Sequence, residues 1–161
     1  MLLAVHKPAA LYYLCMAICT VEKLFVARNR DLELTLLNTT QNGFKKEILT
    51  AELHRPGLAL TGFTERFPHK RIQILGETEM AFLGQLSPER LVEVSELLFA
   101  TEIPTLIISK AITPPLMFLT IADKYNTCVF SSRLTTTVLV TRLGAFLDNF
   151  FAPSTNVHGS L

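Results

Sequence analysis

Hydrophobic and polar residues form blocks whose spacing changes several times along the chain. Apolar residues recur at helical spacing after Thr20, whose hydroxyl suits a helix N-cap, and again after Ser87 and Pro88. A third helical stripe runs over residues 136–152, where Pro153 ends it. Two further helices are expected over residues 77–86 and 113–125. The pattern therefore predicts five helices after residue 19.

Between these helices lie short apolar runs of the kind that form fully buried strands. They cover residues 72–75, 105–109 and 128–131, and residues 32–37 add a strand with alternating polar positions. Asn42-Gly43 is a strong turn signal. Buried strands separated by helices are typical of an α/β layered domain, and we expect a mainly parallel sheet flanked by helices.

Residues 1–19 form an apolar N-terminal extension ahead of this pattern. Leu11, Leu14, Cys15 and Ile18 share one helical face, so an appended amphipathic helix is the preferred interpretation. A cleaved or membrane-anchoring segment is the alternative. His6, Lys7 and Pro8 interrupt the run, which leaves it too short for a stable membrane span.

The composition excludes several classes of protein. The 161 residues are 49% hydrophobic and 18% charged, as in a globular domain rather than a disordered chain. A net charge of +1 gives no reason to expect a nucleic-acid partner. Three irregularly spaced cysteines do not make a disulfide framework or a zinc site, which favours a reducing compartment.

The motifs of common catalytic sites are missing from the sequence. It contains no G-x-x-x-x-G-K-[ST] phosphate loop, no G-x-G-x-x-G after a strand and no G-x-S-x-G elbow. Its four histidines are scattered without a partner at metal-ligand spacing. We therefore expect no metal site and no cofactor in this chain.

Two charged groups near the strand at residue 72 are candidates of low specificity. Glu77 and Glu79 resemble paired carboxylates, but residues two apart diverge on a helix, so a solvated first turn is the preferred interpretation. A basic patch surrounds Phe67 and Pro68 and could meet a phosphate or an acidic partner, although a solvated loop explains it as well. Its members are Arg66, His69, Lys70 and Arg71.

Two other places could present side chains to a ligand or an interface. Arg55 precedes Pro56 and Gly57 in a defined bend that either presents the arginine outward or aims Leu58 and Leu60 into the core. Further along, hydroxyls and a guanidinium follow the strand at 128–131, where ligands gather in open α/β sheets. Ordinary helix capping explains the same residues, which are Ser132, Arg133 and Thr135.

The order of several blocks resembles that of HPr kinase/phosphorylases. The blocks are TVEKL (20–24), RPGLALTGF (55–63), RIQILGETE (71–79), LSPER (86–90), SSRLTT (131–136) and APSTNVHG (152–159). Each is weak alone, but together they follow the family order over residues 20–159. The resemblance divides the chain into the extension 1–19, an N-terminal-like domain 20–151 and a linker 152–161 to an absent catalytic domain.

The resemblance also implies a function. Family members are bacterial cytoplasmic hexamers that phosphorylate a serine of HPr with ATP and reverse that step with inorganic phosphate. Through HPr they control carbon metabolism and the sugar phosphotransferase system. Their N-terminal domain is similar to that of peptidoglycan-precursor (Mur) ligases, while the C-terminal domain handles ATP, Mg²⁺ and HPr.

One catalytic residue of the family matches this chain. It is His158, in a V-H-G motif followed only by Ser160 and Leu161. Without the phosphate-loop lysine and the acidic residue of that family, a histidine cannot position a phosphate or deprotonate a serine. The chain alone is therefore expected to be inactive and to act in assembly or regulation, with a separate or attached catalytic domain and a homo-oligomer as partners. The alternative is an α/β domain that senses a nucleotide-sugar or phosphometabolite near Ser132, Arg133 and Thr135.

Overall fold

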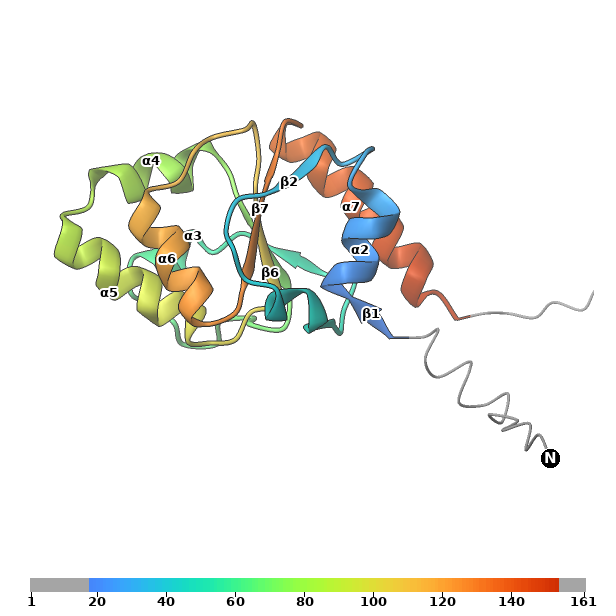
Figure 1. Ribbon diagram of the computed structural model, residues 1–161, viewed down its shortest axis with the longest axis horizontal. Helices are drawn as coiled ribbons and strands as arrows, with labels where there is room; N and C mark the ends of the chain where they lie inside the picture. The colour runs from blue at the N-terminus through green and yellow to red at the C-terminus, as the bar shows by residue number, and fades with distance from the viewer. Residues whose placement is uncertain (1–17, 154–161) are drawn as a thin grey trace, which may run out of the picture.

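The computed structural model describes residues 18–153, which fold into three layers with a sheet between two layers of helices (Figure 1). The sheet has five strands in the order β2-β7-β6-β5-β4. Strands β4 to β7 are parallel to one another, and β2 pairs with β7 in the antiparallel direction. The strands are β2 (Leu34–Leu36), β4 (Leu53–His54), β5 (Ile72–Leu75), β6 (Thr105–Ile108) and β7 (Cys128–Ser132). The predicted mainly parallel α/β fold is confirmed.

One face of the sheet is covered by the helices that connect its parallel strands. They are α3 (Gly57–Leu60), α4 (Glu77–Gln85), α5 (Pro88–Phe99) and α6 (Leu116–Lys124). From β4 to β7, each strand lies next to the preceding one and the sheet grows in a single direction. Crossover connections between parallel strands are right-handed, so connections that all step in the same direction place their helices on the same face of the sheet. Helices α2 (Val21–Arg28) and α7 (Thr136–Phe151) cover the opposite face.

The domain has two hydrophobic cores, one on each face of the sheet, because the central strands are buried on both faces. In β5 and β6, Leu75 and Ile108 pack under α4, α5 and α6, whereas Ile74 and Ile107 pack under α2 and α7. All four side chains are fully buried. This explains the continuous apolar runs in the sequence, since a strand covered on both sides needs no polar alternation.

Local start signals form as the sequence predicts. The Thr20 hydroxyl accepts a hydrogen bond from the backbone of Lys23 at 3.2 Å and caps α2. Ser87 caps α5 in the same way, accepting from the backbone of Arg90 at 3.2 Å with Pro88 in the first turn. Such a cap stabilises a helix by about 1 kcal/mol.

Several details depart from the sequence predictions. In the bend after Arg55, Leu60 is fully buried, but Leu58 is 64% exposed, so only one of the two leucines reaches the core. A two-stranded antiparallel ladder, β1 (Cys19–Thr20) with β3 (Glu47–Ile48), was not predicted. Strands of two residues are too short to show any periodicity. The predicted turn at Asn42-Gly43 is a short 3-10 helix, Asn42–Lys45.

The Lys46 side chain forms hydrogen bonds to the segments that precede β6 and β7, at the amino-terminal edge of the sheet. Its ammonium group donates to the carbonyl oxygens of Ile103 and Tyr125, at 3.2 and 3.3 Å, and to the Thr127 hydroxyl at 2.9 Å. Burial lowers the pKa of Lys46, because removal from water disfavours the charged form. The three bonds satisfy all three protons of the ammonium group.

Within residues 18–153, no helix is long and apolar enough to cross a bilayer. Residues 1–17 of the predicted extension 1–19 and the tail from Ser154, including His158, lie outside the described residues.

Candidate functional site

The chain changes face where β6 and β7 end. The connection after β6 leads to α6 on one face of the sheet, while β7 leads directly to α7 on the other. In open α/β sheets, ligands bind where neighbouring connections leave in opposite directions, outside the carboxyl ends of the strands. This edge of the sheet is therefore the first place to look for a site.

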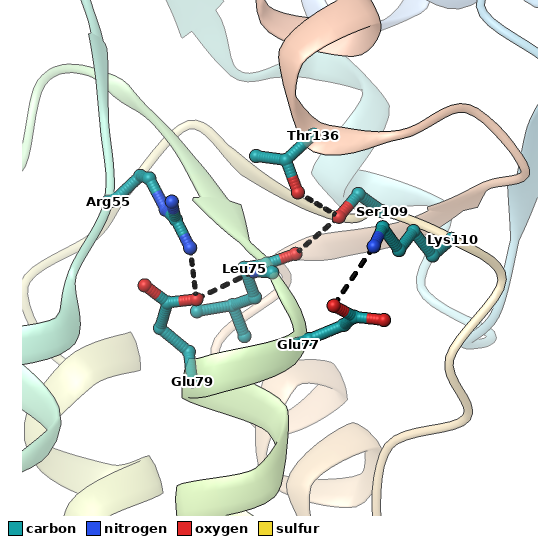
Figure 2. Close-up of polar contacts among 8 residues, drawn as sticks. Arg55, Leu75, Glu77, Glu79, Ser109, Lys110 and Thr136 are labelled. Carbon is teal, nitrogen blue, oxygen red and sulfur yellow. Dashed lines mark hydrogen bonds and ion pairs between the residues drawn. The ribbon is translucent and has the colours of Figure 1, made fainter.

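A group of polar side chains from four segments meets at this edge, and we call it the edge cluster (Figure 2). Its members are Arg55, Glu77, Glu79, Ser109, Lys110 and Thr136. One member follows β4, two lie in the first turn of α4 just after β5, two follow β6, and Thr136 is the first residue of α7.

Ser109 and Thr136 join β6 to α7 within this cluster. Their hydroxyl oxygens lie 2.6 Å apart, and either can be the donor. The backbone N–H of Ser109 donates to the Leu75 carbonyl at 3.0 Å, which continues the pairing of β5 with β6. Ser109 is fully buried, so its hydroxyl is held by these neighbours rather than by water.

The loop after β6 holds two consecutive residues in the left-handed region. Lys110 has φ 59° and Ala111 has φ 53°, which costs about 1 kcal/mol or more for each side chain with a Cβ. Both backbone N–H groups donate to carbonyl oxygens at the end of β7: Ala111 to Ser132, the last residue of the strand, and Lys110 to Leu134 in the loop that follows, each at 2.8 Å. These bonds offset the strain and fix the two diverging loops against each other.

Glu79 and Arg55 form the tightest ion pair of the cluster. Glu79 is 8% exposed; its Oε2 accepts from Arg55 Nη2 at 2.7 Å and from the Gly76 backbone N–H at 2.8 Å. Burial alone would raise the pKa of Glu79, but these hydrogen bonds and the nearby guanidinium outweigh it and hold the pKa below its usual value. The preference for a solvated Glu79 is wrong.

Gly76 makes this close arrangement possible. A Cβ at this position would lie 2.6 Å from Arg55 Nη2, 3.1 Å from Thr136 Oγ1 and 3.2 Å from Glu79 Oε2. Only a residue without a side chain lets all three groups approach the start of α4.

Glu77 behaves as expected for an exposed residue of the first helical turn. Its carboxylate pairs with Lys110 Nζ at 2.9 Å, and its side chain remains 66% exposed. The edge cluster thus holds two cations and two carboxylates in pairs, beside two hydroxyls. Such a cluster can bind a ligand by exchanging one of these pairs, but it contains no nucleophile beside a general base.

The sequence candidates after β7 have mainly structural contacts. The buried Ser132 hydroxyl donates to the Leu32 carbonyl at 2.6 Å and accepts from the Leu134 backbone at 3.2 Å. Thr135 caps α7 by accepting from the Val138 backbone. Arg133 has a 78% exposed side chain, 3.9 Å from Glu33. Arg133 and Thr135 are both exposed, but the Thr135 hydroxyl is engaged in the cap of α7, so Arg133 is the candidate of this segment whose polar group is least held by the fold.

The basic patch lies elsewhere, before β5. His69, Lys70 and Arg71 line a pocket of about 450 Å³ together with Phe67 and Pro68. Arg71 is paired with Glu52 at 2.6 Å, which reduces the positive charge of the patch. The patch does not meet Arg55 or the other members of the edge cluster through any described contact.

Two members of the edge cluster, Ser109 and Lys110, were missed in the sequence, whereas Thr136 belongs to the run of hydroxyls that the sequence marked before the last helix. Ser109 and Lys110 directly follow β6, and the rule that ligands gather at the carboxyl ends of strands could have found them, as it indicated the segment after β7. Across residues 18–153, no group of three or more His, Cys, Asp or Glu residues is arranged to hold a metal ion.

Comparison with known proteins agrees with this architecture. Residues 19–147 match the family described as HPr Serine kinase N terminus. HPr kinase/phosphorylase of Halalkalibacterium halodurans is 38% identical over 121 residues, covering 75% of this chain and 39% of that protein. The Leptospira biflexa protein of the same name is 37% identical over 131 residues, covering 81% of this chain and 40% of its own. The chain thus spans about two fifths of the length of these relatives.

A solved structure has a similar fold with little sequence identity. It contains the CBS and DRTGG domains of the regulatory region of Clostridium perfringens pyrophosphatase, complexed with the activator diadenosine tetraphosphate. The TM-score is 0.52 at 15% identity, covering 81% of this chain and 47% of that one. This likeness concerns the fold alone. The family match over residues 19–147, by contrast, includes every segment of the edge cluster, and the chain belongs to the family of HPr serine kinase N-terminal domains.

Proposed function

We propose that this chain is the assembly or regulatory domain of a bifunctional HPr kinase/phosphorylase. The observation that carries the proposal is the match of residues 19–147 to the N-terminal part of that family. Relatives of this name are more than twice as long as the matched segment, so their remaining part is available for the chemistry.

Phosphoryl transfer needs amides and cations that surround a triphosphate, and metal ions that neutralise the developing charge. The sequence contains no G-x-x-x-x-G-K-[ST] loop. The cations of the edge cluster are matched by carboxylates, Arg55 by Glu79 and Lys110 by Glu77. We therefore assign ATP-dependent phosphorylation of HPr to a C-terminal domain and place the protein in the bacterial cytoplasm, acting on the sugar phosphotransferase system.

The test is reconstitution with a separately expressed C-terminal part of the H. halodurans relative. Size-exclusion chromatography with light scattering measures whether the two form a complex, and a phosphorylation assay on HPr measures activity. We expect a complex, and no phosphorylated HPr from this chain alone. An unrelated α/β domain of the same size serves as the control, and the absence of any complex would contradict an assembly role.

The second candidate is a sensor of a nucleotide-sugar or phosphometabolite at the edge cluster. It is favoured by the position of Lys110 and of two hydroxyls where the chain changes face. A related fold occurs in a regulatory region crystallised with a dinucleotide polyphosphate.

Ligand binding to the folded state raises the melting temperature. We expect a rise with one class of phosphorylated metabolite, reduced in a Lys110→Ala variant. A Lys124→Ala variant, on α6, removes an exposed charge paired with Glu96 and serves as the matched control. Equal melting temperatures across a metabolite panel would exclude the sensor.

A further inference from the structure

An apolar groove lies between the two helices that cover one face of the sheet. Helices α2 and α7 run side by side in Figure 1, and the groove between them has a volume of about 690 Å³. Its lining includes Ile18, Val26, Ala27, Phe146 and Phe150. Val26 is 71% exposed and Ile18 is 38% exposed, so large apolar side chains face solvent here. Such a surface usually receives another apolar element.

The course of the chain brings its N-terminal segment to this groove. Ile18, the first described residue, is itself part of the lining. The ammonium group of Lys23 donates to the Ile18 carbonyl oxygen at 2.7 Å. This bond fixes the start of the described chain beside α2, at the rim of the groove that Ile18 lines.

The sequence ahead of Ile18 has the pattern that such a groove requires. Leu11, Leu14, Cys15 and Ile18 share one face at helical spacing, and Ile18 already lines the groove. Residues 8–17 contain no charged side chain, so their burial leaves no ion without water. Seven residues of helix span about 10 Å, close to the length of about 12 Å expected for the eight residues of α2.

We propose that the groove between α2 and α7 is the docking site of residues 11–17 of the same chain. The side chains of Leu11, Leu14 and Cys15 cover Val26 and Phe150, which removes exposed apolar surface on both sides of the contact. The N-terminal segment is then part of the domain surface that α2 and α7 form.

Cys15 provides a direct readout in the full chain. The other two cysteines, Cys19 and Cys128, are buried, so Cys15 is the thiol that reports on the segment. Its rate of reaction with a thiol reagent is compared with that of a synthetic peptide of residues 8–18. We expect the folded chain to react at least about tenfold more slowly than the peptide, because labelling requires the segment to leave the groove.

Variants on each side of the contact test the site itself. Val26→Asp places a charge on an exposed groove position, and Leu14→Asp places one on the segment; both should bring Cys15 close to the peptide rate. Leu116→Asp, at a 79% exposed position on α6, is the matched control and should leave the protection intact. Circular dichroism checks that each variant remains folded.

Four results would overturn the proposal. The first is labelling of the unmodified chain at the peptide rate, and the second is protection that Val26→Asp leaves unchanged. Protection that disappears on about hundredfold dilution would assign the groove to a second copy of the chain. Protection that appears only when anionic lipid vesicles are added would assign the segment to a membrane surface.

Discussion

The guanidinium of Arg55 reaches a carboxylate 24 positions later in the chain, that of Glu79, which the fold has buried at the start of α4. The same Glu79 oxygen accepts the backbone N–H of Gly76, so one carboxylate joins the end of β4 to the end of β5. This contact organises the edge of the sheet where the connections after β6 and β7 diverge.

Glu79→Gln should lower the free energy of unfolding by about 1–3 kcal/mol. The amide removes the charge from a buried hydrogen bond to Arg55 and can place its NH₂ group against the guanidinium. Urea denaturation measures the change. Glu77→Gln, at a side chain that is 66% exposed, is the matched control and should cost less than about 1 kcal/mol. Equal effects of the two variants would contradict the special role of Glu79.

The contribution of Glu79 should also depend on pH. Its pKa in the folded state is below the unfolded value, which is about 4.3 for glutamate. Its stabilisation is therefore fully present above that unfolded value and is lost as the pH falls through the folded pKa. The stability difference between the unmodified chain and Glu79→Gln should be constant near neutrality and shrink below about pH 4. Urea titrations measure this difference in the free energy of unfolding, and a difference that stays constant down to pH 2 would contradict a lowered pKa of Glu79.

Two glycines should respond to alanine in opposite ways. A Cβ on Gly43 would lie 2.8 Å from both the Asn126 carbonyl oxygen and the Cys128 backbone nitrogen, so we expect Gly43→Ala to cost about 1–3 kcal/mol. Gly144 lies within α7, and beyond the backbone of its own helix turn and its chain neighbours no atom lies within 4 Å of the Cβ position, so Gly144→Ala should stabilise by about 0.5–1 kcal/mol. Thermal melts show whether each variant is less or more stable than the unmodified chain. An unchanged melting temperature for Gly43→Ala would contradict the close approach of the Asn126 and Cys128 backbone to Gly43.

Lys46→Met should destabilise the domain by about 1–3 kcal/mol. The substitution leaves the Ile103 and Tyr125 carbonyl oxygens without the ammonium donor at the amino-terminal edge of the sheet. The neighbouring exposed residue supplies the control, since Lys45→Met should change stability by less than about 0.5 kcal/mol. Chemical denaturation compares both variants, and indistinguishable midpoints would show that the three bonds of Lys46 contribute little.

Cys19 and Cys128 should be unreactive in the folded domain. Both are buried, and burial raises the pKa of the Cys128 thiol to about 12, so almost no thiolate is present at neutral pH. In a Cys15→Ser variant, a thiol reagent at pH 8 should label neither residue before denaturation and both afterwards. Mass spectrometry counts the labels. Rapid labelling of the native variant would show that one of these thiols is accessible.

The sequence by itself determined the features whose cause lies within a few residues. The caps at Thr20 and Ser87 each act on a backbone group three residues later, so the chain need not be folded to indicate them. The buried strands at β5, β6 and β7 were predicted for a similar reason, because an uninterrupted apolar run indicates burial on both faces. The order of the family blocks indicated the family, and the match over residues 19–147 confirms it.

Only the tertiary structure decided which polar side chains meet. Glu79 was expected in solvent because its partner Arg55 belongs to another segment, and nothing local in the sequence marks that contact. Leu58 and Leu60 are both apolar, yet the direction of α3 leaves one exposed and buries the other. Ser109 and Thr136 come together because β6 and α7 end and begin at the same edge of the sheet. Periodicity and capping act over one or two helical turns, whereas contacts between segments depend on strand order and on the side to which each connection turns.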